Sequence, residues 1–205
     1  MTMTTLKAMA LSVTFTIASG SVHASQSTTQ CDYEFSDQQL STMATAYHIG
    51  KQQDLGFTLA AISWRESRAG EDVVSMRNNL KSANMGAFQN RVQTVGKREG
   101  CKTQKCYANV AIKLLVNQEY AANAALDEMN FWLGYHNQNI RKSLSSYNAG
   151  FSRNQKSNSY AADVVKKAKY LQRCVSFKGM AINPKVDPGV IAMNKRTIEK
   201  LKRTR

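Results

Sequence analysis

The stretch Phe57-Thr-Leu-Ala-Ala-Ile-Ser-Trp-Arg-Glu-Ser-Arg68 decides how we interpret this chain. Its first eight residues carry no charge and are apolar on nearly every side, which is typical of a helix that is buried over most of its surface. At about 100° per residue, Glu66 falls on the same helical face as Leu59 and Ile62. The sequence therefore predicts a carboxylate at the end of a hydrophobic helix, on the side that the helix buries.

Two interpretations of Glu66 follow from this stretch. Burial disfavours the charged form of a carboxyl group and raises its pKa, which suits a general acid that works near neutral pH. Alternatively, Glu66 lies on a solvated last turn and pairs with Arg65 or Arg68, because most glutamates in proteins are surface residues. The stretch by itself leaves both interpretations open.

The composition is that of a globular, strongly basic protein. The chain has 205 residues, a usual length for one domain, with 42% hydrophobic and 20% charged residues. Its 28 Lys and Arg residues exceed its 14 Asp and Glu residues, giving a formal net charge of +14. Such a charge can attract nucleic acid, an anionic membrane or an anionic cell-wall polymer, and the charge alone does not choose among them.

The first 24 residues have the features of a secretory signal peptide. Lys7 supplies the positive charge, residues 8–18 form a short apolar core, and Val22-His23-Ala24 offers small residues where a signal peptidase cleaves. We expect cleavage after Ala24 and export to the periplasm or cell-wall space, since the apolar core is too short to span a membrane comfortably. Export makes nucleic acid an improbable partner.

The cysteine content agrees with export. The chain after residue 24 has four cysteines, an even number that permits two disulfides in an oxidising compartment, with three possible pairings. The pairing that we favour closes a tight loop between Cys101 and Cys106 and ties the ends of the domain together through Cys31 and Cys174. No histidine stands at metal-ligand spacing from a cysteine pair, so we expect no metal site. The sequence also lacks a Gly-x-Ser-x-Gly motif and a Gly-rich phosphate loop, and we expect no cofactor.

Helical periodicity predicts a mainly α chain without internal repeats. We expect the mature chain to consist of a helical domain over residues 25–178 and a basic C-terminal extension over residues 179–205. We interpret the last helix of this extension as a solvated cationic tail. Period-2 strands are absent from the pattern, and residues 69–85 are expected to form a long ordered loop. The expected helices cover residues 36–47, 54–66, 86–97, 107–133, 140–147 and 160–174.

Two further short stretches contain candidate binding residues. Gly86-Ala-Phe-Gln89 places a glycine where the backbone can approach a ligand closely and an amide three residues later. Ser146-Tyr-Asn-Ala-Gly150 places a phenol and an amide together at a helix end. Each stretch also has a purely structural interpretation, with Gln89 as a surface residue, Tyr147 as a core aromatic and Gly150 as a helix stop.

The order of these stretches resembles the lytic transglycosylases of the soluble (SLT, goose-lysozyme-like) family. Glu66-Ser67, Gly86 with Gln89, and Ser146–Gly150 correspond to that family's Glu-Ser, Gly-Leu-Met-Gln and Ala-Tyr-Asn-Ala-Gly signatures, in the same order. The resemblance extends over about residues 36–171. Ala and Phe replace Leu-Met in the second signature and Ser replaces Ala in the third, which makes the detailed shape of the sugar groove uncertain.

The resemblance implies a lysozyme-like helical fold and a monomeric enzyme that cleaves the glycan strands of peptidoglycan. Glu66 would act first as the acid and then as the base, and the products would carry 1,6-anhydro ends. The 2-acetamido group of the substrate would take the place of a second enzyme carboxylate. The residues that would hold the sugar are Ser67, Gly86, Gln89, Tyr147 and Asn148.

Two other functions remain open from the sequence. A hydrolytic muramidase on the same fold would need a carboxylate that activates water, and Glu71 or Asp72 would be the candidate. A non-catalytic wall-binding protein could keep the same fold. The sequence does not distinguish among wall turnover, assembly of a secretion or conjugation apparatus, and phage entry or lysis as the biological setting.

Overall fold

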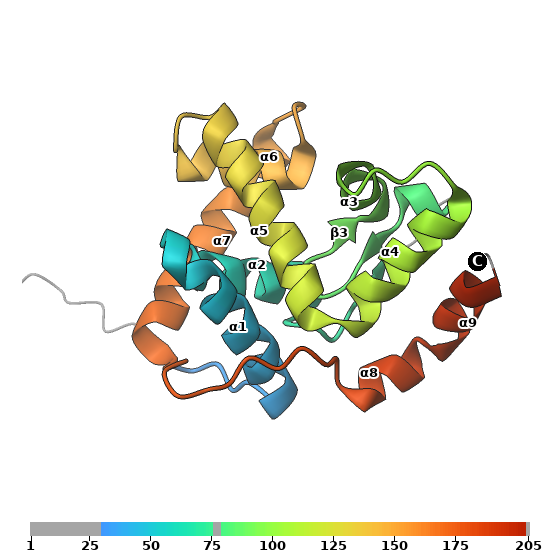
Figure 1. The fold of residues 1–205 in the computed structure, drawn as a ribbon. Helices are drawn as coiled ribbons and strands as arrows, with labels where there is room; N and C mark the ends of the chain where they lie inside the picture. The colour runs from blue at the N-terminus through green and yellow to red at the C-terminus, as the bar shows by residue number, and fades with distance from the viewer. Residues whose placement is uncertain (1–29, 76–78, 204–205) are drawn as a thin grey trace, which may run out of the picture. The chain divides into compact units, whose positions relative to one another are not determined.

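Helix α2 (Gly56–Ser67) carries the stretch described above and lies within the helical core of the protein. A computed structural model describes residues 30–75 and 79–203 of the chain (Figure 1). The expected signal peptide at residues 1–24 lies outside these described residues. From Cys31 onward the chain forms one compact, mainly helical unit, as the periodicity predicted.

The elements of this unit follow a simple order along the chain. The helices and 3-10 helices are α1 (Asp37–Gly50), η1 (Lys51–Gln53), α2 (Gly56–Ser67), η2 (Leu80–Ser82), α3 (Val92–Arg98), α4 (Gln104–Val116), α5 (Gln118–Tyr135), α6 (Ile140–Ala149), α7 (Gln155–Cys174), α8 (Pro188–Met193) and α9 (Lys195–Arg203). The strands are β1 (Val74–Ser75), β2 (Asn84–Met85) and β3 (Asn90–Arg91).

Helix α2 packs against α1 and α7, while α6 lies across α5 and α7 (Figure 1). Local sequence explains where α1 begins, because Ser36 and Gln39 form a reciprocal capping box there. Leu59 and Ile62 of α2 are fully buried, together with Leu144 of α6 and Leu171 of α7. The buried apolar side of α2 is therefore the side that periodicity assigned to it.

A small antiparallel sheet replaces part of the expected loop and helix. Its strand order is β1-β2-β3, with Val74 opposite Met85 and Met85 opposite Asn90. Residues 86–89 form the turn between β2 and β3, and α3 begins only at Val92. The prediction of a helix from Gly86 was wrong, because strands of two residues are too short to produce a period-2 pattern.

The expected helix over residues 107–133 is divided into α4 and α5 at Asn117. Asn117 takes an extended conformation (φ −128°, ψ 104°), and its side chain accepts a hydrogen bond from the Tyr120 N–H at 2.8 Å, which caps α5. The backbone N–H of Gln118 donates to the carbonyl of Pro184 at 2.8 Å. The division thus depends on a contact with a distant segment, which local periodicity does not contain.

The C-terminal extension packs onto the helical domain. Asn183 N–H donates to the Thr45 hydroxyl of α1 at 3.1 Å, and α9 lies against α4 (Figure 1). Ile198 and Leu201 of α9 are buried, whereas the charged face of this helix is exposed. The expectation of a solvated tail was therefore right for the cationic side chains and wrong for the helix, because two apolar side chains one turn apart anchor it.

Two disulfides have the favoured pairing. Cys31 is joined to Cys174 at the end of α7, with Cα atoms 5.5 Å apart, and Cys101 is joined to Cys106, with Cα atoms 5.4 Å apart. The first bridge spans 143 residues of sequence. A bridge that closes so long a loop contributes about 2–4 kcal/mol to stability, by restricting the unfolded chain.

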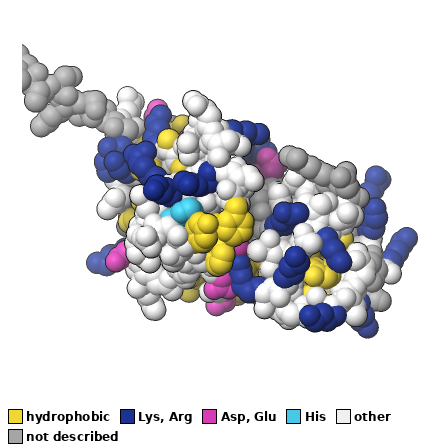
Figure 2. Space-filling view, turned by 90° about the horizontal axis from the view of Figure 1, so that it is seen from above, with side chains coloured by type: hydrophobic (Ala, Val, Ile, Leu, Met, Phe, Trp, Pro, Cys, Tyr) yellow, Lys and Arg dark blue, Asp and Glu magenta, His cyan; other side chains and the backbone are white. Residues whose placement is uncertain are grey.

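The exposed surface combines cationic and apolar areas. On the face that Figure 2 presents, many Lys and Arg side chains and a few Asp or Glu side chains lie around a compact hydrophobic patch beside a histidine. In the part of the chain that the structure describes, no helix has the length and apolar character that a membrane span requires.

Candidate active site

Glu66 lies in the last turn of α2 and is half-buried. Burial raises the pKa of its carboxyl group above the ordinary value, and the hydroxyl of Tyr160 and the charge of Arg65 oppose this shift without cancelling it. The interpretation of Glu66 as a buried-face carboxylate is thus supported by its surroundings. A carboxyl with a raised pKa keeps a larger protonated fraction near neutral pH, as a general acid requires.

Neither neighbouring arginine forms an ion pair with Glu66. Arg65 Nε instead lies 2.9 Å from Asp163 Oδ2 on α7, and its guanidinium lies 5.6 Å from the ring centroid of Tyr160. Arg68 pairs with carboxylates that follow it in the chain. The alternative in which an arginine neutralises Glu66 on a solvated turn is therefore not what the structure contains.

Tyr160, in the first half of α7, is a buried phenol that interacts with the Glu66 carboxyl. Burial and the charge of Glu66 both raise the pKa of Tyr160 well above its ordinary value, so the phenol remains protonated. Its hydroxyl is buried and forms no hydrogen bond of full geometry with a described group, but its weaker interaction with the Glu66 carboxyl lowers the pKa of Glu66. A phenol in this position can steady the carboxylate that forms when Glu66 gives up its proton.

Tyr147 brings a second phenol to the same place from α6. Burial raises the pKa of Tyr147 well above its ordinary value, and the negative charges of Glu66 and Glu128 raise it further. The Tyr147 hydroxyl donates to the carbonyl of Phe88 at 3.1 Å, which joins α6 to the turn between β2 and β3. Glu66, Tyr147 and Tyr160 thus form one electrostatically coupled cluster contributed by three helices.

Ser67 links α2 to the β2–β3 turn. It is buried, and its hydroxyl donates to the Ala87 carbonyl at 2.6 Å and accepts from the Gly70 N–H at 2.8 Å. The hydroxyl is therefore already engaged by protein groups on both sides. Ser67 positions the turn beside Glu66 and has little capacity left for a sugar.

Gly86 and Gln89 stand at the two ends of the same turn, and both have positive φ values, 78° and 48°. A Cβ atom on Gly86 would lie 2.3 Å from the carbonyl oxygen of Leu114, so its close approach is to α4 and not to an open groove. The Gln89 amide nitrogen donates to the carbonyls of Asp72 at 3.0 Å and Gly86 at 3.2 Å. These contacts stabilise the turn itself.

Asn148 is exposed beside Tyr147 at the end of α6 and is the predicted binding residue most open to solvent. The structure thus brings Glu66 and Tyr147 into one cluster, uses Ser67, Gly86 and Gln89 to build the neighbouring turn, and leaves Asn148 at the surface. Sequence reasoning did not identify Tyr160 as a site residue. Its position on the apolar face of α7 is also that of an ordinary core aromatic, so no local signal distinguished it.

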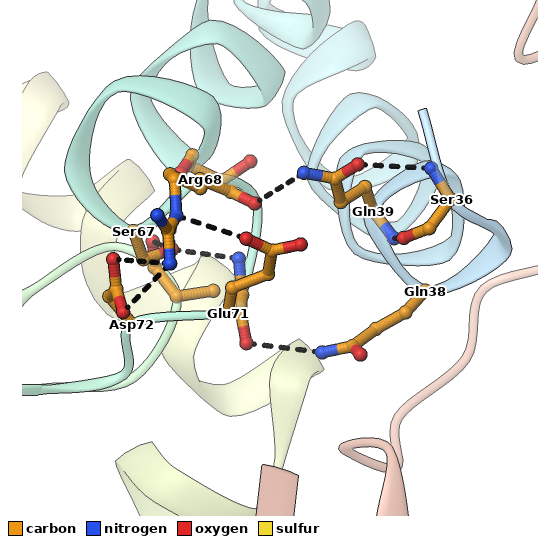
Figure 3. A network of polar contacts seen from close by, with 10 residues as sticks. Ser36, Gln38, Gln39, Ser67, Arg68, Glu71 and Asp72 are labelled. Carbon is orange, nitrogen blue, oxygen red and sulfur yellow. Dashed lines mark hydrogen bonds and ion pairs between the residues drawn. The ribbon is translucent and has the colours of Figure 1, made fainter. Parts of the chain in front are cut away.

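The carboxylates proposed for a hydrolase lie in a different environment. Glu71 and Asp72 both bind Arg68, with Glu71 Oε2 3.0 Å from Arg68 Nε and Asp72 Oδ2 3.1 Å from an Arg68 terminal nitrogen (Figure 3). The carbonyl of Arg68 accepts from Gln39 Nε2 at 3.0 Å, which fixes this ion-pair group against α1 (Figure 3). The charges that act on Glu66 do not include either carboxylate.

Metal binding is not suggested by the side chains in residues 30–75 and 79–203. Within those ranges, no three His, Cys, Asp or Glu residues lie close enough together to hold an ion. The chemistry that the cluster itself offers is proton transfer by Glu66 beside two protonated phenols.

Comparison with known proteins finds a relative that is encoded by a phage. No protein-family model matches the sequence, and no solved structure matches it. The chain is 34% identical over 158 residues to the uncharacterized 20.7 kDa protein in the vs-regB intergenic region of Enterobacteria phage T4, a match that covers 69% of this chain and 84% of the phage protein. The chain belongs to the same family as that protein.

Proposed function

We propose that the protein is a peptidoglycan lytic transglycosylase with a lysozyme-like helical domain. The observation that carries the proposal is Glu66, a half-buried carboxyl with a raised pKa that interacts with the buried phenol of Tyr160 and the partly buried phenol of Tyr147 and has no ion-pair partner among the described residues. The three sequence signatures supply the substrate class, since their order resembles that of the soluble transglycosylases. The geometry supplies an acid that can also serve as a base.

In the first step, protonated Glu66 donates its proton to the glycosidic oxygen between N-acetylmuramic acid and N-acetylglucosamine. The bond from C1 of the muramoyl residue to that oxygen breaks, and the electron pair stays on the leaving oxygen. Positive charge then develops at C1, and the neighbouring 2-acetamido group of the substrate stabilises it. The carboxylate that remains on Glu66 interacts with the protonated phenols of Tyr160 and Tyr147.

In the second step, the Glu66 carboxylate accepts the proton of the muramoyl C6 hydroxyl while O6 forms a bond to C1. This closes a 1,6-anhydro ring and restores protonated Glu66, so the enzyme gains and loses no proton over the cycle. A single carboxyl can serve both steps because the glycosidic oxygen and the C6 hydroxyl lie on the same face of the muramoyl ring. No water molecule is consumed.

A hydrolytic muramidase is less well supported by this arrangement. Such an enzyme needs a second carboxylate that is free to activate water, and Glu71 and Asp72 are both engaged by Arg68. Asp163, the acidic residue paired with Arg65, also binds Lys167 Nζ at 2.8 Å. These carboxylates are occupied by cations and therefore make poor general bases.

The phage relative favours one biological setting over the others. Because the chain shares a family with a phage T4 protein, we favour phage entry or lysis as its setting over wall turnover or a secretion or conjugation apparatus. The expected signal peptide would deliver the enzyme to the periplasm, where peptidoglycan lies.

Mass spectrometry of the fragments released from purified peptidoglycan sacculi tests the proposal. Transglycosylase activity gives muropeptides with 1,6-anhydromuramoyl ends and no new reducing ends. Release of reducing-end muropeptides would replace the proposal with a muramidase. Tight binding to sacculi without release of any fragment would make the protein a non-catalytic wall-binding protein.

A further inference from the structure

A cluster of exposed aromatic side chains lies where the end of α5 meets the end of α6. Phe131 is 52% exposed, Tyr135 59% and Phe151 70%, all unusually high for large apolar residues. All three pack edge-on against the buried ring of Trp132 or against one another, with centroid separations of 4.8 Å from Phe131 to Trp132, 4.9 Å from Phe151 to Trp132 and 5.3 Å from Tyr135 to Phe151. Exposed apolar groups that gather in this way mark a binding surface more often than scattered ones do.

The base of the cluster is tied to α6 by hydrogen bonds and ring contacts. Trp132 is 3% exposed, and its carbonyl accepts from the Ser143 hydroxyl of α6 at 3.0 Å. His136 stacks on Trp132 and lies 2.8 Å, through Nε2, from the Ser146 hydroxyl. These links fix α5 to α6 beneath the exposed rings. A surface held in place by its support loses little conformational entropy when it binds a ligand.

The cluster is continuous with the candidate active site. Trp132 Nε1 donates to Glu128 Oε1 at 2.7 Å, and the charge of Glu128 acts on Tyr147, which the charge of Glu66 also reaches. Phe151 directly follows Gly150, the residue that ends the stretch containing Tyr147 and Asn148. The polar contacts of the cluster therefore reach the surroundings of Tyr147, and Phe151 lies next to the segment that carries Asn148.

Cations border the same cluster. Partial burial, followed by the positive charges of Arg153 and Lys142, lowers the pKa of His136, so both charges lie close to this ring. In Figure 2, Lys and Arg side chains lie above and beside the hydrophobic patch on the face that is shown, and Asp or Glu side chains lie at its lower edge. The combination of flat aromatic rings and flanking cations fits a polymer that offers both apolar sugar faces and carboxylates.

We propose that Phe131, Tyr135 and Phe151 form an aromatic platform on which a peptidoglycan glycan strand stacks outside the cleavage site. The C–H groups on one face of a pyranose ring carry a small positive charge and pack against the negative face of an aromatic ring. Arg153 and Lys142 then attract the carboxylates of the lactyl and peptide groups on the same strand. The identity of the ligand rests on the proposed function, and the platform would hold the polymer while Glu66 acts on one of its bonds.

Binding to purified sacculi tests the platform in the full chain with the Glu66→Gln substitution, which prevents degradation of the ligand. In this background the triple variant Phe131→Ser, Tyr135→Ser, Phe151→Ser is expected to bind at least about tenfold more weakly in a pelleting assay, since a few buried aromatic contacts dominate most interfaces. The matched control replaces three exposed apolar residues elsewhere, Val116→Ser, Ile182→Ser and Met193→Ser, and is expected to bind normally. Unchanged binding by the aromatic variant would overturn the proposal.

A second triple variant separates stacking on sugars from general hydrophobic attachment. Leucine at all three positions keeps the apolar surface but removes the flat rings, so glycan binding is expected to fall nearly as far as with serine. If the leucine variant instead binds sacculi normally, the attachment is generally hydrophobic, and stacking on sugars is ruled out. If the wild-type rings promote binding to anionic lipid vesicles and not to sacculi, the surface is one that binds membranes. Loss of a dimer in sedimentation experiments on the serine variant would make it an interface between copies of the chain.

The outcome for the platform is distinct from the outcome for catalysis. Wild-type protein that releases no fragments from sacculi, but whose binding depends on the three rings, would leave the platform standing and remove the proposed function. If the triple serine variant with Glu66 intact releases anhydro products and binds sacculi as strongly as wild type, the proposed function is supported and the platform is ruled out.

Discussion

Two groups of carboxylates at the end of α2 differ in almost every physical respect. Glu66 is half-buried, lies beside two phenols, and has a pKa that burial raises. Glu71 and Asp72 follow within six residues, and their side chains are 40% and 63% exposed and bound to one arginine, Arg68 (Figure 3). The chain thus gives the same carboxyl chemistry two different environments within six residues of sequence.

The backbone after α2 separates these two environments. Arg68 and Ala69 both take positive φ values, 53° and 57°, and end the helix there. The N–H groups of Glu71 and Asp72 then donate to the Ser67 carbonyl at 2.9 Å and 3.0 Å, which folds their segment back toward Arg68. Glu66 is suited to proton transfer because it is half-buried, whereas Glu71 and Asp72 bind Arg68 and stabilise the end of the helix.

The largest expected effect is on catalysis, and it separates the two groups directly. Glu66→Gln keeps the size of the side chain but cannot donate a proton, so cleavage of sacculi is expected to fall at least ~100-fold. The double variant Glu71→Gln, Asp72→Asn is the matched control and is expected to stay within about threefold of wild type. Quantification of released anhydromuropeptides measures both, and a loss in the control as large as in Glu66→Gln would favour a hydrolase.

The next effect concerns the phenol that lies beside Glu66 and has no equivalent beside Glu71 or Asp72. Tyr160→Phe removes a dipole that favours the ionised carboxylate, so the pKa of Glu66 is expected to rise further. The alkaline limb of the pH–rate profile should move to higher pH, and the maximal rate should fall about threefold to tenfold, because the phenol no longer stabilises the carboxylate, an interaction comparable with a polar contact of ~0.5–1.5 kcal/mol.

Tyr120→Phe is the control for this experiment, because Tyr120 donates to a different carboxylate, that of Glu99. It is expected to leave the pH–rate profile in place. A Tyr160→Phe enzyme with a lower rate but an unmoved profile would indicate that Tyr160 only fills space in the core.

Much of the environment of Glu66 could be predicted from the sequence because it depends on local periodicity. The apolar run before Glu66 placed its side chain on the buried face of α2, and the capping residues Ser36 and Gln39 marked the start of α1. The pairing of Cys31 with Cys174 was favoured, with other pairings open, from cysteine positions at opposite ends of the domain. Each of these inferences uses information that lies within a few residues or in simple counting.

The remaining features depend on contacts between distant segments. Tyr160 looks like any apolar-face aromatic of α7 until α2 is placed beside it, and Gly86 looks like a ligand-facing glycine until Leu114 of α4 is found against it. The break at Asn117 coincides with a hydrogen bond from the next residue to Pro184. Sequence patterns report which faces are buried, but they do not report which segment covers them.

A smaller effect is expected on stability, and its sign depends on pH. The folded-state pKa of Glu66 lies above its ordinary value of 4.5, so the folded protein binds the proton more tightly than the unfolded chain. Stability therefore decreases as pH rises from the ordinary value through the raised one. Glu66→Gln removes this loss, so its melting temperature relative to wild type is expected to increase between pH 4 and pH 8. A difference in melting temperature between Glu66→Gln and wild type that is the same at pH 4 and at pH 8 would contradict the buried-carboxyl interpretation.

The smallest effect is expected from the exposed ion pairs. Replacing Glu71 with Gln and Asp72 with Asn removes the partners of Arg68, but exposed ion pairs contribute only about 0.2–1 kcal/mol each because water and salt screen them. Urea unfolding at low and at high salt is the measurement, and the difference from wild type should shrink as salt screens the charges. A loss of several kcal/mol that persists at high salt would mean that this group holds α2 in place, and Glu66 would then depend on it for its position.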